Sequence, residues 1–398
     1  MISVGIDVSK GKSTICILKP YGEVLQSAVD IEHTESDLFE LVTKIKKFSE
    51  EVKVVMEATG AYHMPILMYL NNQGIFVSVV NPLVMKKYGA KNLRKGKTDK
   101  LDAIKIAKYG LDNWFELKEY KCEEFKYKEL KILGRQYAHY IGMRVESKQT
   151  MSKMLDYTMP GIKKLLSNNS HNPTRDKLND FVECFWHFDN ITKYSEEEFV
   201  DVYIKWAKEK RYHQSAAKAR KIHAVAIDGI STLSSTNNST KLLVEESVRV
   251  LREIDQTLLK ILTQMKEIAK TLKEYDVVRD MGGVGEVLAV RLIAEIGDIN
   301  KFHSKKALIA YAGIDAQPYQ SGQFTGERRR ISKRGSSVLR KTGYEVMAAL
   351  KTVKPKEDSA YKYILKKEYE GKPKKVAKIA GLNKFLRIYY ARVKEVCM

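Results

Sequence analysis

A hydrophobic repeat of seven residues, kept from residue 241 to residue 275, constrains this fold more than any other feature of the sequence. Two apolar series, offset by three, recur every seven residues: Val244, Leu251, Leu258, Met265 and Leu272, and Ile254, Ile261, Ile268 and Tyr275. This spacing predicts a coiled-coil helix about 50 Å long. A looser version over residues 123–155 predicts a second helix. The two helices can pack on each other within one chain or form a contact between two copies, and the sequence leaves both arrangements open.

The N-terminal part of the chain alternates strand and helix patterns. Three short β-rich segments predict strands joined by turns, and two later apolar runs predict strands buried on both faces. The predicted strands span residues 2–8, 13–18, 23–31, 52–56 and 75–80. Helical periodicity falls at residues 36–48 and 65–70. The order β-β-β-α-β-α-β, followed by another helix, is that of ribonuclease-H-like folds.

The chain therefore divides into three predicted domains. An α/β domain covers residues 1–122, a long helical coiled-coil region covers 123–275, and a compact basic domain covers 276–398. The predicted fold class is α/β plus all-α.

The charge balance points to a polyanionic partner. Lys and Arg total 70 against 49 Asp and Glu, which gives a formal net charge of +21. Nucleic acid is the commonest such partner, and the spread of basic residues argues against a membrane surface. Four scattered cysteines indicate neither a disulfide framework nor a zinc site, and no apolar run reaches the ~18 residues of a membrane span. The N-terminus reads as a strand and not as a signal peptide, so we expect a cytoplasmic protein.

Four acidic residues are candidate metal ligands. Asp7 lies inside the first strand, Glu57 follows the fourth, and Asp99 and Asp102 begin a helix. Ribonuclease-H-like topology places the first strand beside the fourth, and a spacing of i, i+3 puts the two aspartates on one helix face. Each acid alone has a structural explanation as a turn residue, a helix cap or a surface charge. Together they predict an oxygen-rich site for Mg²⁺ or Mn²⁺, suited to phosphodiester chemistry.

A glycine-rich turn marks the third region. Gly283 and Gly285 lie between two apolar helical stretches, which predicts a helix-hairpin-helix. Such glycines let backbone N–H groups approach a phosphate. A tight helix–helix turn without a ligand explains them as well.

A basic cluster follows the turn, with one acid, Glu327, among seven cations between residues 321 and 341. The cations are Arg328, Arg329, Arg330, Lys333, Arg334, Arg340 and Lys341. Their charge suits contacts to nucleic-acid phosphates. Ser321, in a glycine-containing loop just before the cluster, is a candidate nucleophile. Spacing alone does not separate it from Ser332, Ser336 and Ser337.

These motifs together resemble the DEDD transposase family of bacterial and archaeal insertion sequences, related to the Piv and MooV DNA invertases. An N-terminal RuvC-like domain matches through GIDVSK, MEATGAY and KTDKLDA. The C-terminal transposase domain matches through GGVGEVLAVRLIAEIGDINKF, LIAYAGI, YQSG and ISKRGSSVLRK. Residues 112–275 match only in being helical. Gln323 departs from the family pattern, in which a second small residue is common after the SG pair.

The resemblance implies a mechanism. Asp7, Glu57, Asp99 and Asp102 would bind Mg²⁺, and Ser321 would attack DNA to form a 5′-phosphoserine link. It further implies strand exchange through a Holliday-junction-like intermediate and active sites assembled from two protomers, in a homodimer that assembles to a tetramer. Members of the family use a noncoding bridge RNA that pairs with target and donor DNA.

Two other functions fit parts of the sequence. A junction-resolving endonuclease would use the same acids to activate water and would form no covalent intermediate. A non-enzymatic nucleic-acid-binding protein would bind through its basic residues, weaken steeply with salt, and need no divalent ion.

Overall fold

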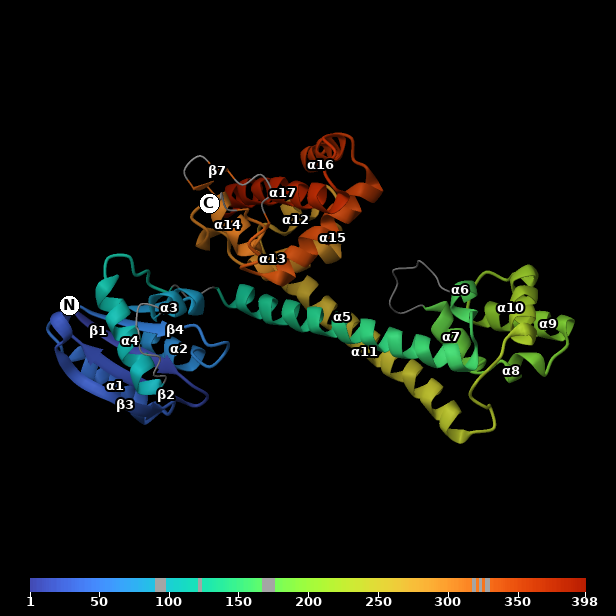
Figure 1. Cartoon of the computed structure of the whole chain (residues 1–398), viewed down its shortest axis with the longest axis horizontal. Helices are drawn as coiled ribbons and strands as arrows, with labels where there is room; N and C mark the ends of the chain where they lie inside the picture. Colours follow the sequence, from blue (N-terminus) through green and yellow to red (C-terminus); the bar gives the residue numbers. More distant parts are fainter. Residues whose placement is uncertain (90–97, 121–123, 167–175, 317–319, 322–323, 326–329) are drawn as a thin grey trace. The chain divides into compact units, whose positions relative to one another are not determined.

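The chain forms two compact units, Met1–Cys122 and Glu123–Met398 (Figure 1). The computed structural model describes residues 1–89, 98–120, 124–166, 176–316, 320–321, 324–325 and 330–398. A mixed sheet with helices makes up the first unit, and helices dominate the second. The predicted fold class is therefore confirmed, while the division into three domains stays a prediction. Among the described residues, no helix combines the length and apolar character needed to span a membrane.

Five strands of the first unit form one sheet in the order β3-β2-β1-β4-β5. The strands are β1 (Ile2–Val8), β2 (Lys12–Leu18), β3 (Val24–Glu32), β4 (Val52–Glu57) and β5 (Val77–Val80). β1, β2 and β3 pair antiparallel, whereas β4 runs parallel to β1 and β5 parallel to β4. This is the predicted ribonuclease-H-like order, with the first strand beside the fourth.

Helices cover both faces of this sheet. They are α1 (Glu35–Lys46), α2 (Met64–Asn72), α3 (Pro82–Gly89) and α4 (Asp99–Asp112), and a short 3-10 helix spans Pro20–Gly22. One face of β1, with Val4 and Ile6, packs in a core with α1 and α2. The other face packs on α4 at unusually short range, because a Cβ added at Gly5 would lie 2.3 Å from the backbone nitrogen of Ala107. A side chain at Gly5 would therefore push the helix off the sheet.

The second unit is built mainly from helices. Its long helices are α5 (Phe125–Thr158), α11 (Asn238–Lys270), α15 (Ser337–Val353) and α17 (Lys374–Cys397). Its shorter helices are α6 (Ile162–Leu166), α7 (Lys177–Cys184), α8 (Asp189–Thr192), α9 (Glu196–Glu209), α10 (Ala216–Asp228), α12 (Tyr275–Arg279), α13 (Glu286–Ile296), α14 (Lys305–Ala312), α16 (Ser359–Tyr369) and a 3-10 turn at Ile299–Lys301. β6 (Gln320–Ser321) and β7 (Phe324–Thr325) pair as a small hairpin.

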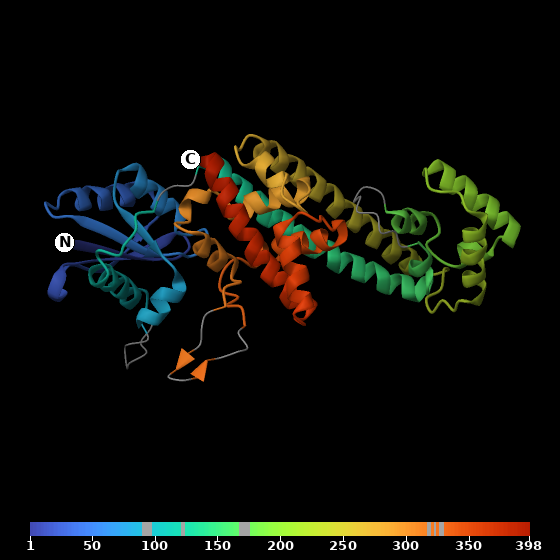
Figure 2. The ribbon, with the colours of Figure 1, turned by 90° about the horizontal axis from the view of Figure 1, so that it is seen from above.

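The heptad pattern is satisfied within one chain along α11, but the helix ends at Lys270, so the predicted seam positions Leu272 and Tyr275 lie beyond it. α5 and α11 pack along each other, and Figure 2 shows them side by side. Leu251, Leu258 and Met265 of α11 are buried in cores that also contain residues of α5. Arg144 of α5 pairs with the buried Asp255 of α11. Of the two arrangements left open by the sequence, the structure shows the intramolecular one.

A small helical lobe, residues 159–237, connects the end of α5 to the start of α11; we call it the insert lobe. Its core combines aromatic and aliphatic side chains of α6 to α10 with side chains of α5 (Met151, Leu155) and α11 (Val244, Val248, Leu251). The lobe begins and ends at one place, since the Thr232 N–H donates to the carbonyl of Tyr157 at 2.9 Å and the Ser231 hydroxyl to that of Thr158 at 2.8 Å.

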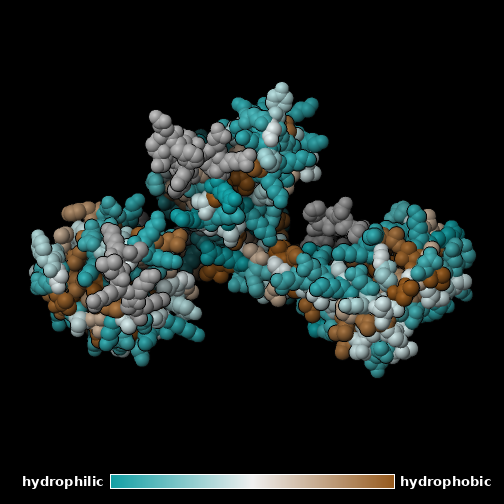
Figure 3. All heavy atoms as spheres, viewed as in Figure 1, coloured by the Kyte–Doolittle hydropathy of each residue, from teal (hydrophilic) through white to brown (hydrophobic). Residues whose placement is uncertain are grey.

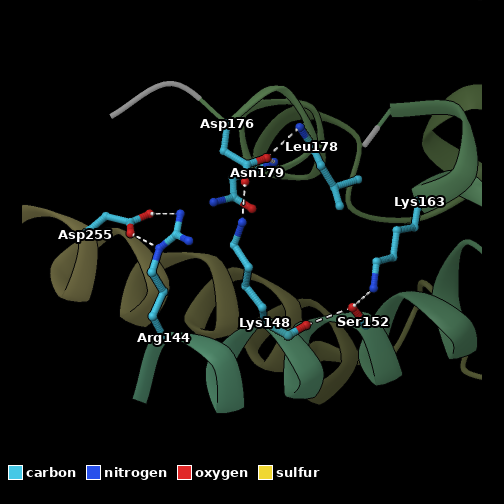
Figure 4. A network of polar contacts seen from close by, with 8 residues as sticks. All are labelled: Arg144, Lys148, Ser152, Lys163, Asp176, Leu178, Asn179 and Asp255. Carbon is cyan, nitrogen blue, oxygen red and sulfur yellow. Dashed lines mark hydrogen bonds and ion pairs between the residues drawn. The ribbon is translucent and has the colours of Figure 1, made fainter. Parts of the chain in front are cut away.

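Polar contacts along α5 tie the insert lobe to the long helices (Figure 4). Asp176 caps α7 by accepting from the backbone N–H of Leu178 at 3.1 Å, and it also accepts from the Lys148 ammonium at 3.0 Å. Lys163 donates to the Ser152 hydroxyl at 2.8 Å. One face of α5 therefore anchors the lobe by charge as well as by apolar packing.

The C-terminal lobe, residues 275–398, packs on the other ends of the long helices. Its core joins α12 to α17 with Leu130 and Tyr137 of α5 and Met265 of α11. α5 and α11 thus contribute side chains to two hydrophobic cores, one at each end.

Candidate functional site

Asp7 and Glu57 occupy equivalent positions at the ends of two neighbouring parallel strands. The register of β1 and β4 pairs Ile6 with Met56, so Asp7 and Glu57 are the next positions along each strand. Alternation along a strand puts Asp7 on the same face as Gly5, the face that α4 covers. Both acids are half-buried. The structure therefore brings these two predicted residues to one edge of the sheet.

α4 runs antiparallel to β1, so its first turn lies at the same edge. Positions along the helix match positions along the strand, because Gly110 lies over Ser3 while Ala107 lies over Gly5. The start of the helix, where Asp99 lies, therefore extends toward the end of the strand that carries Asp7. The contact is made by backbone and small side chains, which fixes the distance between helix and strand.

The helix start shows how its two acids are placed. Thr98 caps α4, because its hydroxyl accepts a hydrogen bond from the Leu101 N–H at 3.2 Å. Capping therefore does not explain Asp99, which is exposed. Asp102 lies 3.5 Å from the Lys105 ammonium and is 29% exposed.

The four acids form a donor set of carboxylate oxygens, which suits Mg²⁺ or Mn²⁺. Within the residues that the structure describes, however, no three His, Cys, Asp or Glu side chains are grouped so that they could hold a metal ion. Carboxylates brought to one edge repel one another, and Asp102 contacts Lys105. The backbone thus places the acids at one edge, and their joint ligation of a metal stays a prediction.

Ser321 lies in β6, where it pairs with Phe324 of β7. Gln323, Glu327, Arg328 and Arg329, which the sequence also singled out, lie outside the described residues. Ser321 belongs to the second unit and the acids to the first. Its role as the nucleophile stays a prediction.

Two of the competing serines have structural tasks. Ser332 donates its hydroxyl hydrogen to Asp315 and accepts from the Arg334 N–H at 3.3 Å. Ser336 caps α15 by accepting from the Leu339 N–H at 3.0 Å. Ser337 is exposed in the first turn of α15. Of the three competitors, Ser337 is therefore the one that needs an experimental control.

The segment that carries Ser321 leaves and rejoins the C-terminal lobe at residues 313–315 and 332–333, which backbone hydrogen bonds join; we call these residues the base of the Ser321 hairpin. The Lys333 N–H donates to the carbonyl of Gly313 at 3.0 Å, and the Ser332 N–H donates to that of Asp315 at 2.9 Å. Gly313 has a φ of +65° and Lys333 one of +52°, so both adopt left-handed backbone conformations at this base. Residues on the two sides of the hairpin are thereby held together.

Glu295 of α13 supports this base, and the sequence analysis missed it. Its side chain is buried, accepts from the Ser336 hydroxyl at 2.8 Å and from the Tyr311 hydroxyl at 3.2 Å, and lies 3.5 Å from the Arg135 guanidinium. A buried carboxylate with three partners links four helices: α5, α13, α14 and α15. Its one sequence signal is a single acid within the apolar run Leu292–Ile296.

The glycine-rich turn serves packing at one of its two predicted positions. A Cβ added at Gly283 would lie 2.8 Å from Leu350 of α15, and the residue has a φ of +72°. Gly285, by contrast, has open space around it and precedes α13. The carboxylate of Glu286, in the first turn of α13, lies 2.5 Å from the Lys266 ammonium, which holds the pKa of Glu286 below its usual range. A phosphate contact at this turn stays a prediction, and Gly285 is the position with room for it.

The predicted cationic residues include both exposed side chains and one with a structural role. Arg330, Lys333 and Arg334 are exposed. Arg340 instead donates to the carbonyl of Ala312 at 2.9 Å, which satisfies the C-terminal end of α14. Arg340 therefore has a structural task, whereas the three exposed cations and Lys341, which is also exposed, are available for phosphate contacts.

Two family models match the chain. A DEDD-type transposase model matches residues 4–160, and the model described as the IS116/IS110/IS902 transposase family matches residues 275–362. The first match includes all four candidate acids and the second includes Ser321. The chain belongs to the DEDD transposase family of insertion sequences. It is an insertion-sequence transposase, as the resemblance predicted.

Some relatives of this transposase align over most of its length, and others over about a quarter of it. The pilin gene-inverting protein of Moraxella lacunata is 21% identical, with 98% of this chain and 95% of the relative covered. An uncharacterized protein of insertion element IS116 from Streptomyces clavuligerus is 23% identical, and the alignment covers 93% of this chain and 89% of the relative. The transposase of IS1111A from Coxiella burnetii is 33% identical, and the alignment covers 24% of this chain and 26% of the relative. Among solved structures, Thermus thermophilus RuvC aligns at 14% identity with a TM-score of 0.24, covering 30% of this chain and all of RuvC.

Proposed function

We propose that this transposase cuts and rejoins DNA through a covalent bond to Ser321, with Asp7, Glu57, Asp99 and Asp102 holding Mg²⁺ or Mn²⁺. The observation that supports it most directly is the placement of Asp7 and Glu57 at paired ends of β1 and β4, with the start of α4 at the same sheet edge. The structural tasks of Ser332 and Ser336 favour Ser321 as the nucleophile among the serines of this region.

The proposed reaction exchanges one phosphate ester for another. The Ser321 hydroxyl oxygen attacks the phosphorus and loses its proton, while the bond to the 3′ oxygen breaks and that oxygen gains a proton. The products are a 5′-phosphoserine and a free 3′-hydroxyl. Another 3′-hydroxyl then attacks the phosphorus and loses its proton, while the bond to the Ser321 oxygen breaks and that oxygen regains a proton, which rejoins the strand. A bound divalent ion supplies charge neutralisation at the scissile phosphate. Arg330, Lys333 and Arg334 contact neighbouring phosphates, which positions the DNA without reading its sequence.

The family resemblance supports three further parts of the proposal. A noncoding bridge RNA guides the choice of target and donor DNA. The protein acts in the cytoplasm as a homodimer that assembles to a tetramer. Each active site combines the acids of one protomer with Ser321 of another.

Trapping of protein on DNA tests the nucleophile. Ser321→Ala should abolish covalent adducts, seen as shifted bands on denaturing gels, and should leave DNA binding within about twofold, because the hydroxyl forms the link without providing charge. Ser337→Ala is the matched control and should form adducts at the normal level. Adducts retained by Ser321→Ala would contradict the proposal. Cleavage without any adduct in the unaltered protein would identify water as the nucleophile, as in a junction-resolving endonuclease.

The same assay tests the acids. Asp7→Asn keeps the size of the side chain but removes the charge that attracts a divalent ion, so cleavage should fall by at least about a hundredfold. Asp112→Asn, at the other end of α4, changes the same residue type away from the site and should cleave normally. An unchanged cleavage rate in Asp7→Asn would refute a metal role for Asp7.

A further inference from the structure

A basic groove lies in the C-terminal lobe, far in sequence from the cationic residues that follow Ser321. It has a volume of about 810 Å³ and forms where the last turns of α17 pass the start of α14, near the end of the chain marked C in Figure 1. Residues 303–305 form one wall and residues 384–398 of α17 and the chain end form the other.

Five cationic side chains and one acidic side chain, Glu395, line this groove. The cations are Lys305, Lys384, Arg387, Arg392 and Lys394. Throughout the described part of the chain, none of the five has an acidic side chain within ion-pair distance. Like charges gathered in one hollow repel one another, and an anion relieves that repulsion.

Neutral amides orient two of these cations. The Arg387 Nε donates to the Asn383 side-chain oxygen at 2.9 Å, and the Lys394 ammonium donates to that of Asn300 at 2.6 Å. Such contacts hold the side chains in place without neutralising their charge. The groove is therefore both positively charged and partly preorganised.

The spacing along α17 suits a run of phosphates. Lys384, Arg387 and Arg392 lie on successive turns, and the first and last are about 12 Å apart along the axis at 1.5 Å per residue. Phosphates of one DNA strand are spaced about 3.4 Å along the duplex axis, so a helix lying along that axis would span three or four of them over this distance. Ile388 and Ala391, between the cations, give the wall a small apolar surface.

We propose that this groove binds the phosphate backbone of duplex DNA, as a second contact separate from the one beside Ser321. Duplex is favoured over single strands because single-strand sites combine cations with aromatic side chains on which bases stack. The aromatic lining consists of His303 and Tyr390, and the Tyr390 hydroxyl donates to the carbonyl of Phe302 at 3.1 Å, which ties this side chain to the protein. Apart from the grey atoms, the face of the C-terminal lobe seen in Figure 3 is mostly hydrophilic.

Salt-dependent binding tests the groove. The variant Lys384→Gln, Arg387→Gln, Arg392→Gln removes three charges from it. The matched control Lys205→Gln, Lys208→Gln, Lys221→Gln removes three exposed charges from the insert lobe. Both are made in full-length Ser321→Ala protein, and fluorescence anisotropy follows binding of a duplex of about 30 base pairs between about 50 and 200 mM salt. Because cleavage plays no part, the outcome is independent of whether Ser321 is the nucleophile.

We expect the groove variant to bind at least about tenfold more weakly at about 100 mM salt. Its slope of log K against log salt should be shallower by about 0.9 for each phosphate that the variant no longer neutralises. The control should stay within about twofold of the unaltered protein, and equal melting temperatures would show that the groove variant folds. Equal binding by the groove and control variants would overturn the proposal. A loss of binding to RNA but not to duplex DNA would also overturn it, since the occupant would then be RNA. So would a loss of DNA binding that accompanies dissociation of the protein into smaller assemblies, since the groove would then hold a second copy of the chain.

Discussion

Single side chains decide how the C-terminal lobe holds the chain that carries Ser321. The buried Glu295 carboxylate accepts from the Ser336 hydroxyl, so removal of the side chain leaves that hydroxyl without this acceptor, whereas the Tyr311 hydroxyl keeps the Glu295 backbone carbonyl at 3.2 Å. A buried group that loses its partner typically costs about 1–3 kcal/mol.

Replacement of Glu295 should loosen the base of the Ser321 hairpin. We expect Glu295→Ala to lower the free energy of unfolding by about 1–3 kcal/mol and to speed hydrogen exchange at the amides of Lys333 and Ser336. Glu295→Gln keeps an acceptor oxygen, so its effects should lie between those of Glu295→Ala and the unaltered protein. Glu253→Ala, an exposed glutamate of α11, serves as the control and should leave both amides unchanged. Unchanged exchange in Glu295→Ala would show that Glu295 does not support this base.

Cys397 provides a pH-dependent test of the same lobe. Burial, with the nearby Glu274 carboxylate, raises the pKa of the Cys397 thiol to about 11. Only the thiolate reacts with iodoacetamide, so at pH 8 about one thiol in a thousand is reactive. We expect alkylation, measured by mass spectrometry, to be slow at pH 8 and to rise as the pH approaches 11. Glu274→Gln removes the neighbouring charge and should speed the reaction at pH 8; labelling of Cys397 at the rate of a free thiol in the unaltered protein would contradict the raised pKa.

Among the elements, the contact of α4 with β1 matters most for the candidate metal site. Gly5 has no room for a Cβ, whereas a Cβ at Gly142, on the exposed side of α5, would meet no atom of the described residues within 4 Å. The two glycines therefore make opposite predictions for the same substitution.

Gly5→Ala should destabilise the first unit by about 1–3 kcal/mol or more, because the backbone of α4 must move. Gly142→Ala should stabilise its helix by about 0.5–1 kcal/mol, since alanine is the better helix former. Thermal unfolding followed by circular dichroism, with hydrogen exchange to locate the change, checks both. Equal changes in stability for the two substitutions would contradict this prediction, because they would mean that α4 and β1 can accommodate a methyl group at Gly5.

Sequence patterns were informative where a feature is local or repeats along one element. Alternation and apolar runs predicted the strands, and the order of elements predicted that β1 lies beside β4. The same patterns did not reveal that Gly283 packs against Leu350 or that Glu295 joins four helices. Those contacts join residues that are far apart in the sequence, and no repeating spacing predicts them. The sequence also did not decide whether α11 pairs with α5 or with a second copy of the chain, since a heptad predicts an apolar face on a helix but not the helix that packs against it.

For the whole molecule, the proposed division of the active site between two protomers makes a specific prediction. A mixture of Asp7→Asn and Ser321→Ala proteins should recover strand cleavage, because an assembly of both contains sites with intact acids and an intact serine. Each variant alone should be inactive. Recovery to about a quarter of normal activity is expected for random pairing, measured as adduct yield against the unaltered protein. No recovery under conditions in which the two proteins co-purify would show that each site is formed by one chain.

The insert lobe has a further consequence for the whole molecule. Because residues 231–233 return to the end of α5 that the lobe left, the chain outside the lobe needs only a short connection to remain continuous. A module attached in this way can differ in length or surface while the helices that carry it keep their pairing, provided that the side chains packed against α5 and α11 are kept. Variation among relatives is therefore expected to concentrate there, where the architecture accommodates it at the lowest cost.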